Sequence, residues 1–173
     1  MVHGASFSEA NEFALALVGP NDAYIHPSDD PLLWHGHTML VDEMARQGPK
    51  PDVVVLSVGG GGLFCGVVEG LRRNGWGDVP VVAVETMGAD SLAQSMQAGH
   101  TVTLPAINSM ATSLGSRAVC AQSLRLAQEH PASRRWCRTR PPWKLAWRCW
   151  TTTACWSNPP VARCWQRCTA YPG

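Results

Sequence analysis

The sequence predicts an α/β fold in which helices cover both faces of a parallel sheet. Two short runs of apolar, mostly β-branched residues, 52–58 and 79–85, each have the length and composition of a buried strand. A helical pattern over 63–74 lies between them, so strand, loop, helix and strand follow one another in about 33 residues. Parallel neighbours need such a crossover helix, and the connection is right-handed. We therefore expect a βαβ unit at the centre of the fold.

The remaining elements are predicted from apolar spacing and from start and stop signals. Residues 4–19 contain the capping candidates Ser6 and Ser8 and end at a Gly-Pro pair, which predicts a helix. A short strand and a loop with two prolines are expected over 23–31, followed by an amphipathic helix over 31–48. Beyond the βαβ unit, helical patterns cover 90–99 and 109–130.

Composition divides the chain into two parts. Residues 1–130 contain all 13 acidic residues and six of the 14 basic ones. Residues 131–173 contain the other eight basic residues, with five of the seven cysteines and six of the eight tryptophans. No run of about 18 apolar residues occurs, and no basic segment precedes an apolar stretch at the N-terminus, so a membrane span and a secretory signal are not expected. We expect a cytoplasmic protein.

Four consecutive glycines, Gly59–Gly62, stand between the first predicted strand and the helix that follows it. Backbone N–H groups at the positive end of a helix dipole bind anions, phosphate above all. Ligands of open α/β sheets lie outside the carboxyl ends of the strands, where this loop is expected. One or two glycines would satisfy a tight turn with close helix–strand packing, so four of them favour a phosphate site.

Two other phosphate motifs fit the loop less well. A nucleoside-triphosphate loop ends in Gly-Lys-Ser/Thr, whereas Leu-Phe-Cys follows here. The dinucleotide spacing G-x-G-x-x-G fails from both Gly59 and Gly60, although Glu85 ends the next strand, where a ribose-binding acid would stand. A non-catalytic phosphate- or dinucleotide-binding module is therefore kept as the alternative.

Several motifs resemble those of the pyridoxal-phosphate (PLP) enzymes of the serine/threonine dehydratase family, which have a tryptophan-synthase-beta-like fold of type II. They are "SVGGGGL", "VVAVET" and "SMATSLGSRAV". "IHPSDDPLLWHGH" and "VTLPAINSMATSLGSRAV" are similar to the L-serine dehydratase branch, where Ser28 departs from a common aromatic residue. The resemblance covers about residues 1–130. It implies that 1–30 end the smaller cofactor domain and that 31–130 belong to the larger PLP-binding α/β domain.

The resemblance also implies site residues. It places the cofactor phosphate at the glycine loop, and Ser113 where the backbone lines the cofactor ring. It places a monovalent cation such as K⁺, bound in some members, beside Glu85, for which a cap of the Thr86–Ala89 turn is the alternative role. The implied residues are Gly59, Gly60, Gly61, Gly62, Leu63 and Ser113 for the cofactor, and Glu85, Ala89, Ser91 and Leu114 for the cation.

A dense polar cluster, with three histidines and two aspartates between residues 26 and 37, invites comparison with a metal site. His35 and His37 are two residues apart, so on a helix they point in different directions. Two prolines interrupt the cluster, and it contains no cysteine. We therefore interpret it as a solvated helix start.

The implied reaction is a β-elimination that converts L-serine, and often L-threonine, to a 2-oxo acid and ammonia. This chemistry requires a Schiff-base lysine. The only lysines are Lys50, in a proline-flanked loop, and Lys144, in the basic tail, and neither has the family's Ser-x-Lys setting. The Ser-x-Gly-Asn loop for the substrate carboxylate is also absent. We expect a chain that begins inside the family pattern and is inactive alone, while the intact relative is a homodimer.

Residues 131–173 mix Trp, Cys, Arg and Pro without a clear period. The segment has no C-x₂-C pair and no histidine, which argues against zinc, and a basic–aromatic nucleic-acid tail is a further, less favoured hypothesis. Shifted by one base, the frame from Trp150 onward is compatible with "LVEPACGA", which is very similar to the C-terminal segment of serine dehydratases. We predict a frameshift near residues 130–135 and an irregular, non-native tail.

Overall fold

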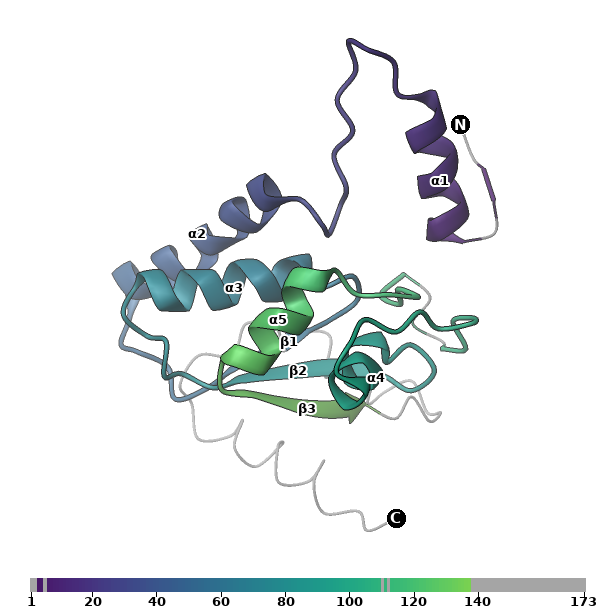
Figure 1. Cartoon of the computed structure of the whole chain (residues 1–173). Coiled ribbons are helices and arrows are strands. Elements are labelled where there is room, and N and C mark those ends of the chain that lie inside the picture. Colours follow the sequence, from purple (N-terminus) through teal and green to yellow (C-terminus); the bar gives the residue numbers. More distant parts are fainter. Residues whose placement is uncertain (1–2, 5, 110, 112, 138–173) are drawn as a thin grey trace. The chain divides into compact units, whose positions relative to one another are not determined.

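The computed structural model describes residues 3–4, 6–109, 111 and 113–137 (Figure 1). They belong to one compact unit, Met1–Arg138. The predicted tail therefore lies outside the described residues from 138 onward, together with Lys144 and the cysteines of that segment. The elements in chain order are α1 (Phe7–Leu17), α2 (Pro31–Gln47), β1 (Val54–Ser57), α3 (Gly62–Arg73), β2 (Val81–Thr86), α4 (Ser91–Ala98), α5 (Ala121–Glu129) and β3 (Ala132–Cys137).

The described strands form one parallel sheet in the order β1-β2-β3. Val54 pairs with Val81 at the start of the β1–β2 ladder, and Val81 pairs with Ala132 on its other side. The predicted βαβ unit is confirmed as β1, α3 and β2. The α/β class is confirmed as well, and the carboxyl ends of the strands share one edge.

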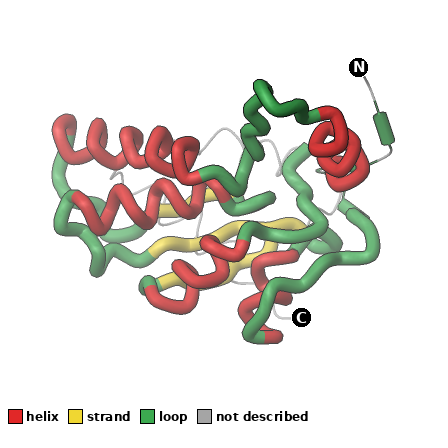
Figure 2. Tube along the Cα trace, turned by 45° about the horizontal axis from the view of Figure 1, so that its top comes forward, coloured by secondary structure: helices red, strands yellow, loops and turns green. Residues whose placement is uncertain are grey.

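Helix α3 and its neighbour α2 run side by side next to the sheet (Figure 2). The core between α3 and the strands is apolar: Phe64 and Leu71 of α3 are fully buried, and burying such side chains stabilises a fold by about 1.5–3 kcal/mol each. On the side toward α2, α3 carries two glycines. A Cβ on Gly66 would lie 2.3 Å from His37 Cβ, and one on Gly70 would lie 2.9 Å from Val41 Cβ. The two helices therefore pack with their backbones close together.

Caps explain where the first two helices begin. Ser6 Oγ accepts the N–H of Glu9 at 3.3 Å and starts α1. Asp30 Oδ1 accepts the N–H of Leu32 at 2.8 Å, with Pro31 as the first residue of α2. Such caps stabilise a helix by about 1 kcal/mol. Both helices were predicted over these residues. None of the described helices has the length and hydropathy to cross a membrane.

Four predictions about local structure are wrong. Residues 23–26 form no strand, and the described residues between 109 and 120 (109, 111 and 113–120) form a loop that precedes the shorter helix α5. Strand β1 is buried on one face only, since Leu56 is 4% exposed and Val55 is 44% exposed, although burial on both faces was predicted. Finally, residues 132–137 pair with β2 as strand β3, where an irregular tail was expected from residue 131. This strand forms because parallel pairing satisfies its backbone, beginning with the N–H of Val81 donated to the carbonyl of Pro131 at 2.9 Å.

Candidate phosphate and cofactor site

The glycine loop lies at the carboxyl end of β1 and leads directly into α3. Gly61 is the N-cap of that helix and has a φ of 95°, a left-handed conformation that favours glycine. The first amide of α3 that donates to a described carbonyl is that of Cys65, which bonds Gly61 O at 3.0 Å. The preceding N–H groups at this helix end have no partner within the helix, as at any N-terminus, and they can bind an anion.

Each of the four glycines also lies in close contact with other parts of the protein. A Cβ on Gly59 would lie 2.1 Å from the carbonyl oxygen of Leu114, and one on Gly61 would lie 2.5 Å from Ser123 Oγ. Both distances are far below van der Waals contact. The number of glycines therefore does not by itself indicate phosphate, as the sequence argument assumed. Anion binding here would instead use the amides of the α3 N-terminus that have no partner within the helix.

Ser28 occupies the side of the loop that Gly60 and Gly62 leave open. Its Oγ is 2.2 Å from the position of a Cβ on Gly60, and its backbone is 3.0 Å from that of a Cβ on Gly62. Two hydrogen bonds hold it there: Trp34 Nε1 donates to Ser28 O at 2.8 Å, and the N–H of Ser28 donates to His26 Nδ1 at 3.1 Å. The site thus combines a hydroxyl with helix amides, and this donor set fits a phosphate group.

The turn at residues 113–114 also reaches the glycine loop. Leu114 supplies the carbonyl oxygen that faces Gly59, and its N–H donates to the carbonyl of Ala111 at 3.1 Å. Ser113, the preceding residue, is exposed in this turn. Both predicted residues are therefore placed next to the loop, Leu114 by contact and Ser113 by its position in the chain.

Glu85 is buried beneath the start of α4, with 2% of its surface exposed. Its Oε1 accepts the N–H of Leu92 and its Oε2 accepts the N–H of Ala93, both at 2.8 Å. Burial raises the pKa of this carboxyl to about 7, while the two backbone hydrogen bonds act in the opposite direction. The carboxylate thus caps α4, whereas the Thr86–Ala89 turn is closed by a backbone hydrogen bond of 2.9 Å.

Two of the residues implied for a cation, Ala89 and Ser91, flank the N-cap of α4, next to the amides that bond Glu85. Ser91 is 1% exposed, and its Oγ is a buried side-chain oxygen with no hydrogen-bond partner. The turn that contains Leu114 reaches Ala89, because a Cβ on Gly115 would lie 3.1 Å from Ala89 Cβ. A buried hydroxyl without a partner, one residue before the amide that bonds a buried carboxylate, fits a monovalent cation, since each carboxylate oxygen can accept a second contact.

A cavity of about 190 Å³ is lined in part by Ser28 and Cys120, which both contact Gly60 of the loop. Residues from α1, from the loop before α2 and from the segment before α5 line it, including Phe7, His26, Ser28, Ser116 and Cys120.

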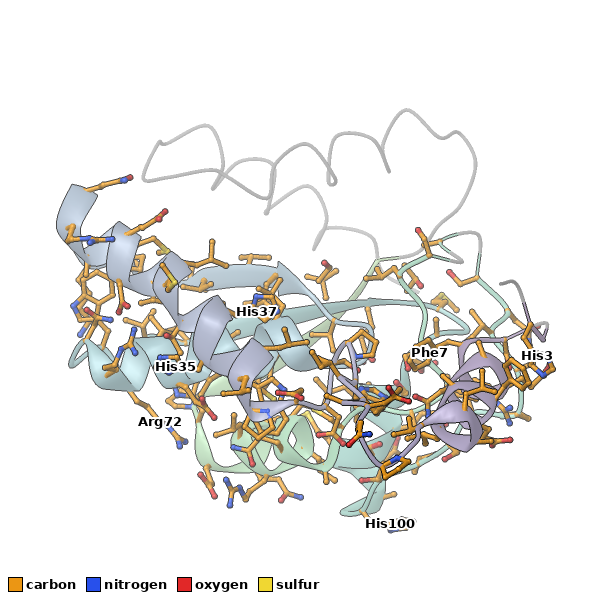
Figure 3. The ribbon with its side chains drawn as sticks, turned by 90° about the horizontal axis from the view of Figure 1, so that it is seen from above. His3, Phe7, His35, His37, Arg72 and His100 are labelled. Carbon is orange, nitrogen blue, oxygen red and sulfur yellow. The ribbon has the colours of Figure 1, made fainter. Side chains whose placement is uncertain are left out.

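The polar cluster is distributed over several structural roles. His26 Nδ1 accepts the N–H of Asp29 at 2.8 Å, and Asp30 caps α2, so part of the cluster does form a helix start. His35 is exposed and His37 packs against α3 (Figure 3). Among the described residues, no group of three or more His, Cys, Asp or Glu side chains is placed to hold a metal ion.

Lys50 lies at the amino end of the strands, whereas the glycine loop lies at their carboxyl end. It precedes β1, whereas the loop follows β1. Its Nζ forms an exposed ion pair with Asp78, at 2.6 and 2.7 Å from the two carboxylate oxygens. A second hollow, of about 280 Å³, is located here and is lined by Lys50, Asp78 and the adjacent residues. It is separated from the loop by the length of the strands.

Sequence reasoning missed the neighbours that position the loop. Ser28 was noted only as a departure from a common aromatic residue, and its contact with the loop crosses about 30 residues of chain. Ser123 and Cys120, which face Gly61, were not singled out. No local motif marks them, because their contacts depend on how α5 docks. The amides of Leu92 and Ala93 were also missed as partners of Glu85.

Proteins with similar sequences come from one enzyme class. Residues 1–133 match the family model described as "Pyridoxal-phosphate dependent enzyme". The L-serine dehydratase/L-threonine deaminase of Homo sapiens is 52% identical over 133 residues, which are 75% of this chain and 40% of that relative. The chain spans about 40% of the length of the curated relatives it matches.

Two of the similar solved structures are also enzymes that act on serine or threonine. A fungal L-serine ammonia-lyase from Rhizomucor miehei superposes with a TM-score of 0.74 at 38% identity, over 80% of this chain and 44% of that one. Isoform 2 of threonine deaminase from Solanum lycopersicum gives a TM-score of 0.72 at 29% identity, over 80% of this chain and 40% of that one.

Proposed function

This chain belongs to the family of pyridoxal-phosphate dependent enzymes, and we propose that it is the cofactor-phosphate-binding part of an L-serine/L-threonine dehydratase. The observation that carries the proposal is the open α3 N-terminus behind the glycine loop, with the Ser28 hydroxyl beside it. The reaction proposed for the whole enzyme is the deamination of L-serine or L-threonine by β-elimination. A homodimer, a cytoplasmic location and the frameshift near residues 130–135 stay predictions.

The chain's own residues would bind and orient the cofactor. We assign Gly59, Gly60, Gly61, Gly62 and Leu63 to its phosphate, and Ser113 to the backbone beside its ring. When bound, PLP supplies an electron sink for breaking the Cα–H bond of an amino acid. Phosphate binding at the end of β1 would fix the position of the ring outside the carboxyl edge of the sheet.

Gly61→Ala tests the phosphate site. Alanine at a φ of 95° is strained, and its Cβ would meet Ser123 Oγ at 2.5 Å. We expect the variant to bind pyridoxamine 5′-phosphate about tenfold more weakly, because the loop must shift away from α5 and a misplaced donor set loses affinity steeply. Calorimetric titration measures this. That ligand has no aldehyde, so it reports non-covalent binding only.

Gly99→Ala is the matched control for this variant. Gly99 also has a positive φ, 77°, but a Cβ there would have no neighbour within 4 Å. Gly99 is the C-cap of α4, far along the chain from the glycine loop. Alanine at this position therefore strains the backbone in the same way as in Gly61→Ala but does not displace the glycine loop. Pyridoxamine, which lacks the phosphate, should bind both variants and the parent chain equally weakly. Equal binding of the phosphorylated ligand by Gly61→Ala and the parent chain would contradict the proposal.

We assign a monovalent cation such as K⁺ to Glu85, Ala89, Ser91 and Leu114. The support is the unpartnered, buried hydroxyl of Ser91, the residue before Leu92, whose N–H donates to the buried Glu85 carboxylate. We expect K⁺ at ten times its dissociation constant to stabilise the chain by about 1.4 kcal/mol relative to tetramethylammonium, and Ser91→Ala to remove most of this gain. Thermal unfolding in the two salts measures it. An equal K⁺ effect in both proteins would contradict the assignment.

The alternative, a dinucleotide-binding module, has less support. It would use Glu85 to bind a ribose hydroxyl, yet that carboxylate is 2% exposed and already caps α4.

A further inference from the structure

Two buried cysteines lie side by side behind the glycine loop. Cys65 belongs to the first turn of α3 and Cys120 is the N-cap of α5, so 55 residues separate them in sequence. Their Sγ atoms are 3.7 Å apart, within hydrogen-bond distance for thiols. Both are free thiols, 0% and 6% exposed. No role in cofactor or cation binding has been assigned to either.

Both cysteines are hydrogen-bonded to the glycine loop through their backbones. The N–H of Cys65 donates to Gly61 O, and the N–H of Cys120 donates to Gly60 O, both at 3.0 Å. Cys120 Sγ is also 3.3 Å from the position of a Cβ on Gly61. If the two cysteines move closer together, the hydrogen bonds from their N–H groups therefore displace the carbonyls of Gly60 and Gly61.

Cys120 has the environment of a reactive thiol. It stands at the positive end of α5, and its hydrogen bond with Cys65, together with the hydroxyl and amide of Ser123, lowers its pKa to about 7. Burial and its contact with Cys120 raise the pKa of Cys65. Cys120 also lines the cavity of about 190 Å³ that Ser28 and Ser116 line, so a small oxidant in that cavity lies next to this residue.

We propose that Cys65 and Cys120 are a redox modification site, which a peroxide closes to a reversible disulfide, and that closure weakens anion binding at the glycine loop. The predicted loss of anion binding rests on the proposed phosphate site, whereas the formation of the disulfide does not.

The chemistry balances with hydrogen peroxide as the oxidant. The Cys120 thiolate attacks one peroxide oxygen, the O–O bond breaks, and the leaving hydroxide takes up a proton to form water. Cys65 Sγ then attacks Cys120 Sγ. The S–S bond forms as the S–O bond breaks, and the sulfenic oxygen leaves as a second water with the proton from Cys65. The thiol pair loses two electrons and the peroxide gains them.

Closure would deform the loop. A disulfide needs an Sγ–Sγ distance of about 2.05 Å, so the two sulfurs must approach by about 1.6 Å from their present 3.7 Å. The first turn of α3 and the start of α5 move with them and carry the Gly60 and Gly61 carbonyls. We expect binding of pyridoxamine 5′-phosphate to weaken about tenfold, since displacements near 1 Å misalign donors strongly.

The test uses the full chain, oxidised with hydrogen peroxide, alkylated in denaturant and digested with trypsin without reduction. Cleavage after Arg46, Arg72, Arg117 and Arg125 places the two cysteines on separate peptides, 47–72 and 118–125. We expect mass spectrometry to find these peptides joined after oxidation and separate after dithiothreitol. Titration of pyridoxamine 5′-phosphate should give about tenfold weaker binding to the oxidised chain, reversed by dithiothreitol.

Cys120→Ser is the matched control, because serine keeps the size and the N-cap chemistry of the residue. It should form no joined peptide, and its ligand binding should not respond to peroxide. In Cys65→Ser, Cys120 should be trapped as a sulfenic acid by dimedone. The proposed Cys65–Cys120 disulfide would be wrong if Cys120 were found joined to another cysteine. It would also be wrong if Cys65 could still be alkylated after Cys120 is oxidised. A disulfide with unchanged binding would overturn the coupling to the loop. A reduced chain that binds no phosphate ligand would instead refute the proposed function.

Discussion

Replacing Glu85 with glutamine is expected to remove a fall of about 2–3 kcal/mol in the free energy of unfolding between pH 5 and pH 8. Burial raises the pKa of this carboxyl from 4.5 to about 7. Between these two values the folded chain holds a proton that the unfolded chain has released. Stability therefore decreases as the pH rises from about 4.5 to 7 and is level above that range.

Glutamine removes the titration but also one acceptor. Its amide nitrogen cannot accept the N–H that the second carboxylate oxygen accepts, so one of the amides of Leu92 and Ala93 loses its partner. This loss costs about 1–3 kcal/mol at every pH. The variant should therefore be less stable than the parent at pH 5, and the difference should shrink or reverse at pH 8.

Urea unfolding of both proteins at the two pH values, in tetramethylammonium salts, measures the difference. His130 complicates the absolute values but not the comparison. It is 5% exposed, and burial lowers its pKa, so its contribution to stability is lost as the pH falls. That contribution is common to the parent and the variant. A difference between them that stays the same at both pH values would show that Glu85 titrates as a solvated acid.

The central elements of the fold could be predicted because each depends on a local pattern. Burial of 79–85 follows from its continuous apolar run, and the start of α2 follows from Asp30 and Pro31. Exposure of β1 could not be predicted in this way. Its sequence is as apolar as that of β2, and Val55 is accessible because the protein covers the face of β1 that carries Leu56 but leaves the opposite face open.

The loop before α5 is a second part of the fold that could not be predicted from local sequence. Residues 109–120 have a helical composition, but their backbone is drawn into contacts that a helix would not allow. The N–H of Cys120 bonds Gly60 O, and the N–H of Leu104 bonds Arg117 O at 2.7 Å. These contacts hold the segment against the glycine loop and compete with helix formation. Tertiary hydrogen bonds therefore outweigh local propensity here.

The candidate site likewise contains residues that could be predicted from the sequence and residues that could not. Its glycines, and the position of Glu85 at the end of a strand, could be read from the sequence. The partners that give these residues their chemistry come from other parts of the chain: Ser28 at the loop, and the α4 amides at the carboxylate. Such partners are set by docking between elements, which no local pattern encodes.

Lys50 is expected to take no part in turnover, and the 173-residue chain is expected to form pyruvate from L-serine at least about 10³-fold more slowly than a full-length relative. A lysine that bonds the cofactor must reach the ligand bound at the glycine loop. Lys50 instead lies before β1, at the other edge of a parallel sheet, and its ammonium is held by Asp78. This exposed ion pair is worth at most about 1 kcal/mol. The distance along the strand, rather than the pair, therefore keeps Lys50 away from the loop.

Lys50→Arg tests this prediction most directly. Arginine keeps the ion pair with Asp78 but cannot form a Schiff base with the cofactor. The chain and the variant are incubated with equimolar PLP, reduced with borohydride, digested and mapped, and pyruvate is measured in parallel. We expect the same residual rate and the same non-covalent affinity for the cofactor in both proteins. Lys144→Arg, in the segment outside the described residues, extends the comparison to the second lysine. If Lys50→Arg abolished a cofactor absorbance or a serine-dependent rate present in the parent, the chain would carry its own base. The separation of the phosphate loop from the catalytic lysine would then be wrong.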